Sequence, residues 1–303
     1  MSRLSYVLIT AARNEADHIE KTIRSVMAQT VLPLRWVIVD DGSTDRTSEI
    51  AQRYAAEAPW MDVVRMPARE DRSFAGKAHA FNTGCDRVED LDYDVVGNLD
   101  ADISFDEGYF EFLLGRFEAM PKLGAAGTHY VEGTFHSYRD SYINVHHVNG
   151  QCQLFRRACF KQIGGYRPVK GGGIDWIAST TARMKGWQTY SFSEMTFTHH
   201  RGMGTAESGV LGARFHYGKK DYWCGGHPLW QLTRAMYQMA KPPYLVGGLC
   251  LLGGYCWAWM SGTERPVSKE LMAFHRREQM QRLRELISQR FVTGRLRGTD
   301  AQE

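Results

Sequence analysis

Short apolar runs alternate with helical patterns along the first hundred residues. Residues 5–10, 36–39 and 61–65 are apolar runs with the length and composition of buried strands. Apolar residues recur at helical spacing over 16–29, and a turn rich in helix-capping residues precedes a helix over about 46–56. Strands and helices that alternate at these lengths predict a mostly parallel sheet with helices on its faces.

The alternation continues along the chain and its pattern changes after about residue 120. A helix that begins at 76 leads to a strand ending at Leu99. The segment 151–157 predicts a strand followed by a helix. A further helix over about 175–185 follows the glycine loop 171–173. These elements extend the predicted α/β fold to about residue 210.

Three polar turns follow predicted strands, at 11–15, 40–45 and 100–102. Ligands of parallel sheets bind beyond the carboxyl ends of the strands, so we expect the three turns to form one crevice. Asp100 and Asp102 are two residues apart, and in extended backbone they project to the same side. Two carboxylates so placed are suited to a hard divalent cation shared with substrate phosphates.

The overall composition excludes some classes of protein. Hydrophobic residues make up 43% of the 303 residues, and the net charge of +3 is too small to indicate a nucleic-acid partner. The six cysteines form no Cys-x-x-Cys pair, which argues against a zinc knuckle or a disulfide scaffold and suits a reducing compartment. The first residues lack the long apolar core of a signal peptide. We therefore expect a cytoplasmic protein.

Several motifs occur in a fixed order over about residues 5–205. Asp-Asp-Gly-Ser-Thr-Asp-Arg-Thr begins at Asp40, Gly-Lys-Ala begins at Gly76, and Asp-Ala-Asp begins at Asp100. Together with the loop 10–15 and the segment 155–166, they resemble the motifs of the family-2 glycosyltransferases, which adopt the GT-A fold. The likeness departs from the family at Ala11, where proline is usual, and at Ile174, where glutamate is frequent.

The resemblance implies inverting transfer of a sugar from a nucleotide-sugar donor to a hydroxyl acceptor, in polysaccharide or glycoconjugate synthesis. Its implied cofactor is Mg²⁺ or Mn²⁺, and its implied acceptor is a saccharide or a lipid-linked glycan. It makes Asp175 the catalytic base. It assigns donor binding to Ala11, Arg13, Glu15, Asp41, Lys77 and Asp100, and metal binding to Asp102, Asp100 and His199, with His200 as the alternative histidine.

The chemistry of the side chains agrees with these roles, although each has a structural alternative. The Asp41 carboxylate accepts hydrogen bonds, as a nucleobase or ribose requires, and Lys77 supplies a positive charge. Asp175 can take the proton of an attacking hydroxyl group. Structurally, Asp40 or Asp41 would cap the helix that follows, Lys77 would be a solvated lysine, and Asp175 would cap its own helix.

Other functions fit the sequence less well. Nucleotidyltransferases and dinucleotide oxidoreductases need a glycine-rich loop after the first strand, and residues 11–15 contain no glycine. A non-catalytic subunit that binds nucleotide sugar or anchors a synthase would not need Asp175. The Gln-x-x-Arg-Trp element of processive polysaccharide synthases is not evident, which disfavours a long-chain polymerase.

Residues 211–303 predict a helical C-terminal extension. The 17 residues 244–260 carry no charge, which is near the lower limit for crossing a bilayer, and aromatic residues lie at one end. A basic amphipathic helix over 268–290 is suited to an anionic membrane surface. We therefore predict association with the inner face of the cell membrane; a buried pair of helices and a homodimer contact are the alternatives.

Overall fold

The chain forms two compact units, which are described separately. The first is Met1–Gly202 and the second is Met203–Glu303. The predicted domain boundary after residue 210 stays a prediction, and it falls in the first turn of helix α8 (Gly209–Trp223). The computed structural model describes residues 4–68, 74–137, 145–169, 171–201 and 209–299.

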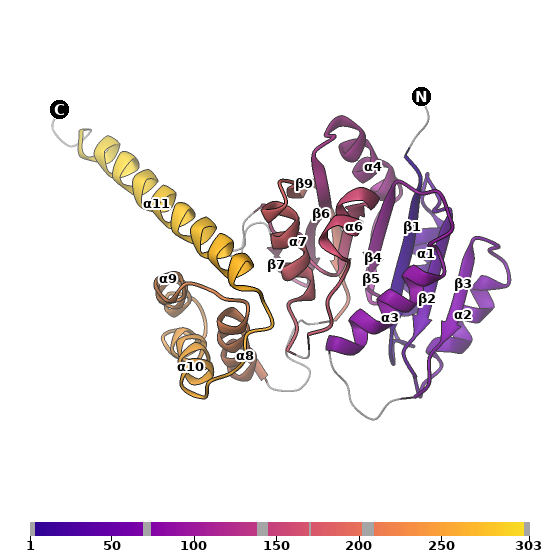
Figure 1. Cartoon of the computed structure of the whole chain (residues 1–303), viewed down its shortest axis with the longest axis horizontal. Coiled ribbons are helices and arrows are strands. Elements are labelled where there is room, and N and C mark those ends of the chain that lie inside the picture. Colours follow the sequence, from indigo (N-terminus) through magenta and orange to yellow (C-terminus); the bar gives the residue numbers. More distant parts are fainter. Residues whose placement is uncertain (1–3, 69–73, 138–144, 170, 202–208, 300–303) are drawn as a thin grey trace. The chain divides into compact units, whose positions relative to one another are not determined.

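The first half of unit one alternates strands with helices, as its apolar pattern predicts (Figure 1). Strands β1, β2, β3 and β4 are parallel and lie in the order β3-β2-β1-β4. Helix α1 begins at Ile19, later than predicted, because the preceding residues form a turn on the carbonyl of Glu15. The elements are β1 (Tyr6–Ala12), α1 (Ile19–Met27), β2 (Arg35–Asp40), α2 (Thr47–Ala55), β3 (Met61–Arg65), α3 (Phe74–Asp86) and β4 (Val95–Leu99).

The second half of unit one makes the sheet mixed. Strand β8 is antiparallel to both β4 and β6, whereas β9 is parallel to β6. The antiparallel strand β5 follows β9 at the end of the sheet, and β7 pairs with β6. The elements are β5 (Ile103–Ser104), α4 (Tyr109–Ala119), β6 (Leu123–Glu132), β7 (Phe135–His136), β8 (Cys152–Arg156), α6 (Arg157–Ile163), α7 (Ile174–Met184) and β9 (Gln188–His199).

The core lies on both faces of the sheet, which explains why its strands are continuous apolar runs. On one face of β1, the Tyr6 ring packs against Phe110 of α4 at a ring-centroid distance of 5.1 Å. On the other face, Ile9 lies against Gly84 of α3. Ala11 belongs to β1 and pairs with Val39, so the polar turn begins later than predicted.

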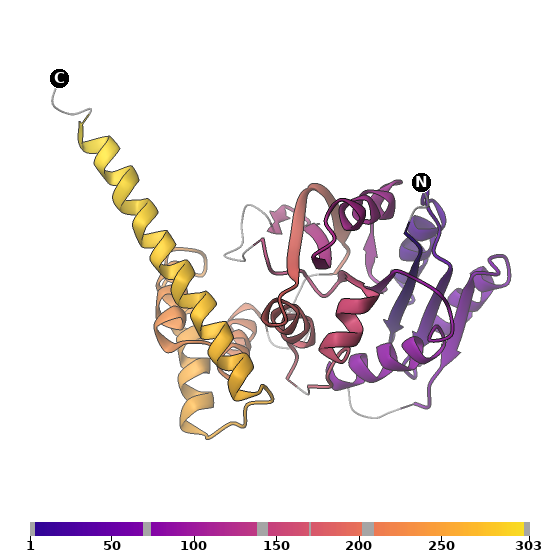
Figure 2. The same ribbon diagram turned by 45° about the horizontal axis from the view of Figure 1, so that its top comes forward.

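Unit two consists of helices (Figures 1 and 2). Helix α10 (Val246–Met260) packs against α8 and α9 (Pro228–Met239), and the long α11 (Lys269–Thr299) follows. Among the residues that the structure describes, no helix combines the length and the apolar character that a membrane crossing requires.

Glycine on the inner side of α10 allows the close approach of α8. A Cβ atom at Gly254 would lie 1.9 Å from the carbonyl oxygen of Phe215, a distance that side chains do not tolerate. A Cβ atom at the neighbouring Gly253 would meet no atom closer than 3.9 Å. The two adjacent glycines therefore differ in whether they can accept a methyl group.

Replacing Gly254 with Ala is expected to destabilise unit two by about 1–3 kcal/mol, because the backbone of α8 must move away. The matched variant Gly253→Ala is expected to be as stable as the natural chain or slightly more stable, since alanine favours helix. Urea unfolding followed by circular dichroism measures both. Equal unfolding midpoints for the two variants would show that α8 and α10 are not in this close contact.

Candidate active site

The turns after β1 and β2 are tied together by hydrogen bonds. The Asn14 amide oxygen accepts from the Thr44 main-chain N–H at 2.9 Å, and the Asn14 N–H donates to Ser43 Oγ at 3.0 Å. The Glu15 N–H donates to Thr47 Oγ1 at 2.7 Å. Two of the three predicted turns therefore meet at the carboxyl edge of the sheet.

Asp45, rather than Asp40 or Asp41, serves the start of α2. Its Oδ1 accepts from both the N–H and the hydroxyl of Thr47, at 3.0 and 2.5 Å. Burial alone would raise the pKa of Asp45, but these hydrogen bonds lower it. Asp40 Oδ1 instead accepts from the Ser43 N–H at 2.8 Å, so the alternative in which Asp40 or Asp41 caps this helix is wrong. Asp41 is buried at the end of β2.

The donor-binding candidates of the first loop take different positions. Ala11 is half-buried in β1, and Arg13 is half-buried just after that strand. The Glu15 carboxylate forms an ion pair with Arg201, which follows β9. The first loop is therefore joined to the end of β9 as well as to the turn after β2.

Lys77 of α3 reaches the turn after β4. Its ammonium group forms an ion pair with Asp100 Oδ1. Burial alone would lower the pKa of Lys77, but the carboxylates of Asp100, Asp175 and Asp102 raise it. Burial raises the pKa of Asp100, with Asp102 adding to the effect and Lys77 opposing it. One lysine thus lies within electrostatic reach of three carboxylates from different parts of the chain.

Asp102 faces the end of β9. Its Oδ2 lies 3.5 Å from His199 Nε2 and 3.8 Å from Arg201 Nε. Burial alone would raise the pKa of Asp102, but the hydrogen bond and charge of His199 and the charge of Arg201 lower it. The His200 ring instead contacts Ser104 Oγ at 2.8 Å. Of the two candidate histidines, His199 is the one whose ring lies against the Asp102 carboxylate, whereas His200 donates its main-chain N–H to the Asp102 carbonyl at 2.9 Å.

The residues around Asp102 fit a divalent cation. His199 Nδ1 lies 3.1 Å from Glu132 Oε2, and a histidine held by a carboxylate in this way presents its other nitrogen to a metal. In the described part of the chain, no three such side chains are already gathered as metal ligands. Asp100, Asp102 and His199 offer the oxygen and nitrogen donors that Mn²⁺ accepts, and substrate phosphates would supply the rest.

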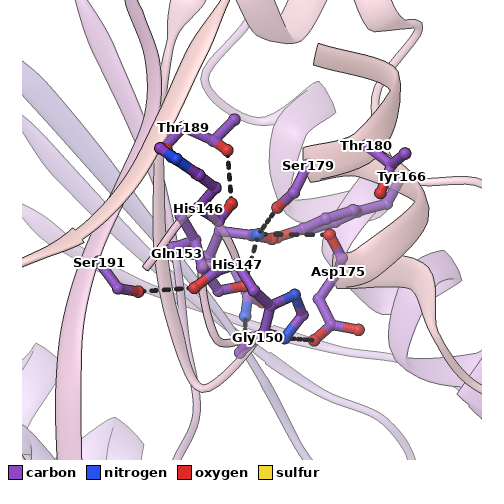
Figure 3. A network of polar contacts seen from close by, with 12 residues as sticks. His146, His147, Gly150, Gln153, Tyr166, Asp175, Ser179, Thr180, Thr189 and Ser191 are labelled. Carbon is purple, nitrogen blue, oxygen red and sulfur yellow. Dashed lines mark hydrogen bonds and ion pairs between the residues drawn. The ribbon is translucent and has the colours of Figure 1, made fainter. Parts of the chain in front are cut away.

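Asp175 lies in the first turn of α7 (Figure 3). The N-cap of α7 is Gly173, which has a φ of 90°, so the alternative in which Asp175 caps its helix is wrong. Its Oδ2 lies 4.0 Å from His147 Nε2. A Cβ atom at Gly150 would come within 2.8 Å of the Asp175 Cβ, so the loop before β8 passes directly beside this carboxylate.

Gln153 of β8 joins the elements around Asp175. Its amide nitrogen donates to Ser179 Oγ at 2.8 Å and to the Val148 carbonyl at 3.1 Å, and its oxygen accepts from the Tyr166 hydroxyl at 2.5 Å (Figure 3). Gln153 is fully buried. The start of α7 is thereby held against β8. The Asp175 carboxylate in its first turn lies within electrostatic reach of Lys77, as the carboxylates of Asp100 and Asp102 do.

Four residues of this site carry no role in the sequence prediction: Glu132, His147, Gln153 and Arg201. Arg201 directly follows the two candidate histidines in the sequence, which is a weak indication that it belongs to the site. No sequence motif singles out the other three. Each contacts a residue that is distant in the chain: Glu132 contacts His199 of the paired strand β9, and His147 and Gln153 contact Asp175 and Ser179 of α7.

Comparison with known proteins places the chain in a family. Residues 7–164, more than half of the chain, match the family model described as glycosyl transferase family 2. The poly-β-1,6-N-acetyl-D-glucosamine synthase of Staphylococcus aureus (strain MSSA476) is 33% identical over 117 residues, which are 39% of this chain and 26% of that protein. The synthase of Staphylococcus epidermidis is 30% identical over 122 residues, which are 40% of this chain and 27% of that protein. The match thus spans about a quarter of the length of these curated relatives.

Solved structures share the fold. Mannosyltransferase PcManGT from Pyrobaculum calidifontis, in complex with GDP-Man and Mn²⁺, has a TM-score of 0.56 and 19% identity, over 90% of this chain and 79% of that one. TarS 1–349 from S. aureus, in complex with UDP-GlcNAc, has a TM-score of 0.53 and 14% identity, over 90% and 78%. At these identities the likeness concerns the fold alone, and the predicted GT-A fold is confirmed.

Proposed function

The chain belongs to glycosyltransferase family 2 and is a glycosyltransferase, and on this premise we propose that it transfers a sugar from a nucleotide-sugar donor to a hydroxyl acceptor with inversion of the anomeric centre. The observation that carries the proposal is the ion pair of Lys77 with Asp100, together with the charges of Asp102 and Asp175, which also raise the pKa of Lys77. Family membership alone does not require these carboxylates to share one crevice. Their grouping supports a site that binds a diphosphate and removes a proton beside it.

The donor occupies the carboxyl edge of the sheet. Asp41 accepts hydrogen bonds from the base or the ribose, and Lys77 places a positive charge near the phosphates. Ala11 near the end of β1, and Arg13 and Glu15 in the loop that follows, would lie on the other side of the nucleotide. Relatives and structural neighbours carry names with N-acetylglucosamine, UDP-GlcNAc and GDP-Man, which supports a nucleotide sugar as the donor class.

Asp100, Asp102 and His199 would hold Mg²⁺ or Mn²⁺ between the protein and the diphosphate. When bound, the ion would offset negative charge on the departing diphosphate as a Lewis acid. Arg201 lies 3.8 Å from Asp102 and contributes a second positive charge at the same edge. The presence of Mn²⁺ in the names of two neighbouring structures supports a divalent cation.

Asp175 acts on the acceptor. Its carboxylate takes the proton of the attacking hydroxyl group while the hydroxyl oxygen forms a bond to the anomeric carbon. The bond from that carbon to the diphosphate oxygen breaks on the opposite side, so the configuration inverts and a nucleoside diphosphate leaves. The acceptor is a saccharide or a lipid-linked glycan, reached from the cytoplasm.

The test is a transfer assay with a panel of donors. Purified full-length chain is incubated with UDP-GlcNAc, UDP-glucose or GDP-mannose, saccharide acceptors and Mn²⁺, and nucleoside diphosphate is measured by chromatography. We expect release from one donor that rises with acceptor and stops when EDTA is in excess. Proton NMR of the product gives its anomeric configuration. Retention of configuration, or turnover that EDTA leaves unchanged, would contradict the proposal.

A further inference from the structure

Helix α10 exposes several large apolar side chains and turns glycines inward, although Leu251 and Tyr255 are also buried. Val246, Leu249 and Met260 are exposed, at 47%, 57% and 74% of their surface. The buried side includes Gly248 and Gly254, which approach the backbones of α9 and α8. A helix of a water-soluble unit normally buries most of its large apolar residues, so this number of exposed ones is unusual. Small residues between packed helices and large apolar residues outside are typical of helices that contact lipid.

Helix α9 also exposes large apolar side chains, although Trp230 is buried. Leu229, Leu232 and Met236 recur at helical spacing and are exposed. Its buried residues include Gln231, which is fully buried, and Gln238. The Gln231 side-chain nitrogen donates to the Leu251 carbonyl of α10 at 3.0 Å. The interior between these two helices is therefore partly polar, while apolar side chains face outward.

The exposed apolar side chains are concentrated in unit two. Of the sixteen large hydrophobic residues exposed in the described part of the chain, fourteen belong to this unit. One small buried hydrophobic cluster of the unit consists of Tyr222, Tyr255 and Ala258. Scattered exposed hydrophobic residues are ordinary, but their concentration on neighbouring helices indicates a binding surface.

The charges of this segment suit an anionic partner. Residues 222–263, which include α9 and α10, contain no aspartate or glutamate, and their charged residues are Arg234 and Lys241. The whole of unit two carries 14 lysine and arginine residues against 8 acidic ones, a net charge of +6. An anionic surface would meet no acidic side chain over α9 and α10.

Aromatic side chains of α9 and α10 are paired with lysines of α8 and of the segment after α9. The Lys219 ammonium lies 4.5 Å from the Trp257 ring, and that of Lys241 lies 4.6 Å from the Tyr237 ring. Trp259 is 65% exposed. Tryptophan and tyrosine are enriched at the boundary between lipid and water, and lysine can lay its stem on apolar surface while its charge stays in water.

From these observations we propose that the outer face of α9 and α10 binds the surface of an anionic phospholipid bilayer. Only one face of each helix is apolar and exposed, so the helices lie in the interfacial plane, with their inner faces on the rest of the unit. A second copy of the chain fits this face less well, because two units of charge +6 would be brought together.

The test uses the full-length chain and sedimentation with extruded vesicles. Vesicles of phosphatidylcholine with 30% phosphatidylglycerol are compared with phosphatidylcholine alone, each at low and high salt. We expect binding to the anionic vesicles that weakens with salt, because the attraction is screened. The double variant Leu249→Glu with Trp259→Glu is expected to lower the partition coefficient about tenfold or more, since two charges must enter the interface.

The control variant Leu34→Glu changes an exposed leucine of unit one and is expected to bind vesicles like the natural chain. Circular dichroism of each variant establishes that it is folded. Absence of binding by the natural chain, or equal binding by the double variant, would overturn the proposal. Light scattering that shows a dimer, which the double variant converts to monomer, would assign the face to self-association instead. Vesicle binding needs neither donor nor acceptor. A chain that failed to transfer sugar could therefore still bind vesicles, and the two proposals can fail separately.

Discussion

Replacing Asp175 with Asn is expected to reduce sugar transfer by about a hundred- to ten-thousand-fold, because a general base is removed. Asparagine keeps the shape of the side chain beside Gly150 and cannot accept the proton of the acceptor. The fold should persist, since Gly173 forms the N-cap and Gln153 holds the first turn of α7 through other residues. Loss of a carboxylate from the first turn of a helix costs about 0.3–1 kcal/mol.

Two measurements separate the role of Asp175 from binding. Calorimetry with the nucleoside diphosphate and Mn²⁺ is expected to give the same affinity for Asp175→Asn as for the natural chain, and the transfer assay is expected to give the large loss. The exposed Asp90 serves as a matched control, since Asp90→Asn changes the charge equally. Weakened nucleotide binding would assign Asp175 to donor binding. Undiminished transfer would show that Asp175 takes no part in the chemical step.

Replacing Asp102 with Asn is expected to lower turnover about a hundredfold or more, through loss of charge stabilisation at the diphosphate. The carboxylate lies beside His199 and Arg201, and an amide cannot replace its negative charge toward a cation. The residual activity of Asp102→Asn is expected to be insensitive to EDTA. Asp106, four residues later and exposed, provides the control variant Asp106→Asn.

Titration of Mn²⁺ in the presence of the nucleoside diphosphate measures the metal site directly. The natural chain and Asp106→Asn are expected to bind the ion with the same affinity, and Asp102→Asn is expected to bind it more weakly. Full activity of Asp102→Asn in excess chelator would rule out the metal role. Normal Mn²⁺ binding with reduced turnover would instead assign Asp102 to holding Arg201 and His199 in place.

Most of the secondary structure follows from local patterns. The strand over 61–65 has the same bounds in the structure, and the helices near 46–56 and 175–185 are shifted by a residue or so at their ends. Whether two strands are parallel or antiparallel does not follow from local patterns, because it depends on which strands become neighbours. The insertion of β8 between β4 and β6, antiparallel to both, has no local signal in 151–157 and makes the sheet mixed.

Part of the candidate site could likewise be predicted from local sequence, and part of it could not. Asp100 and Asp102 could be selected from the sequence because they follow an apolar run, and the turns at 11–15 and 40–45 because they follow strands. The choice between His199 and His200 needed the pairing of β9 with β5, in which adjacent residues face opposite sides of the sheet. Two adjacent residues of the same type can be told apart only by the side of the strand on which each side chain lies.

The C-terminal unit shows the division between sequence and structure most clearly. The sequence by itself determined that 222–263 is apolar, rich in glycine and free of acidic residues, because these are properties of composition. Only the tertiary structure decided that Gly254 faces inward and Leu249 outward. The physical reason is steric: at Gly254 the backbone of α8 comes so close to α10 that no side chain fits between them, so glycine occupies this contact and Leu249 lies on the outer side.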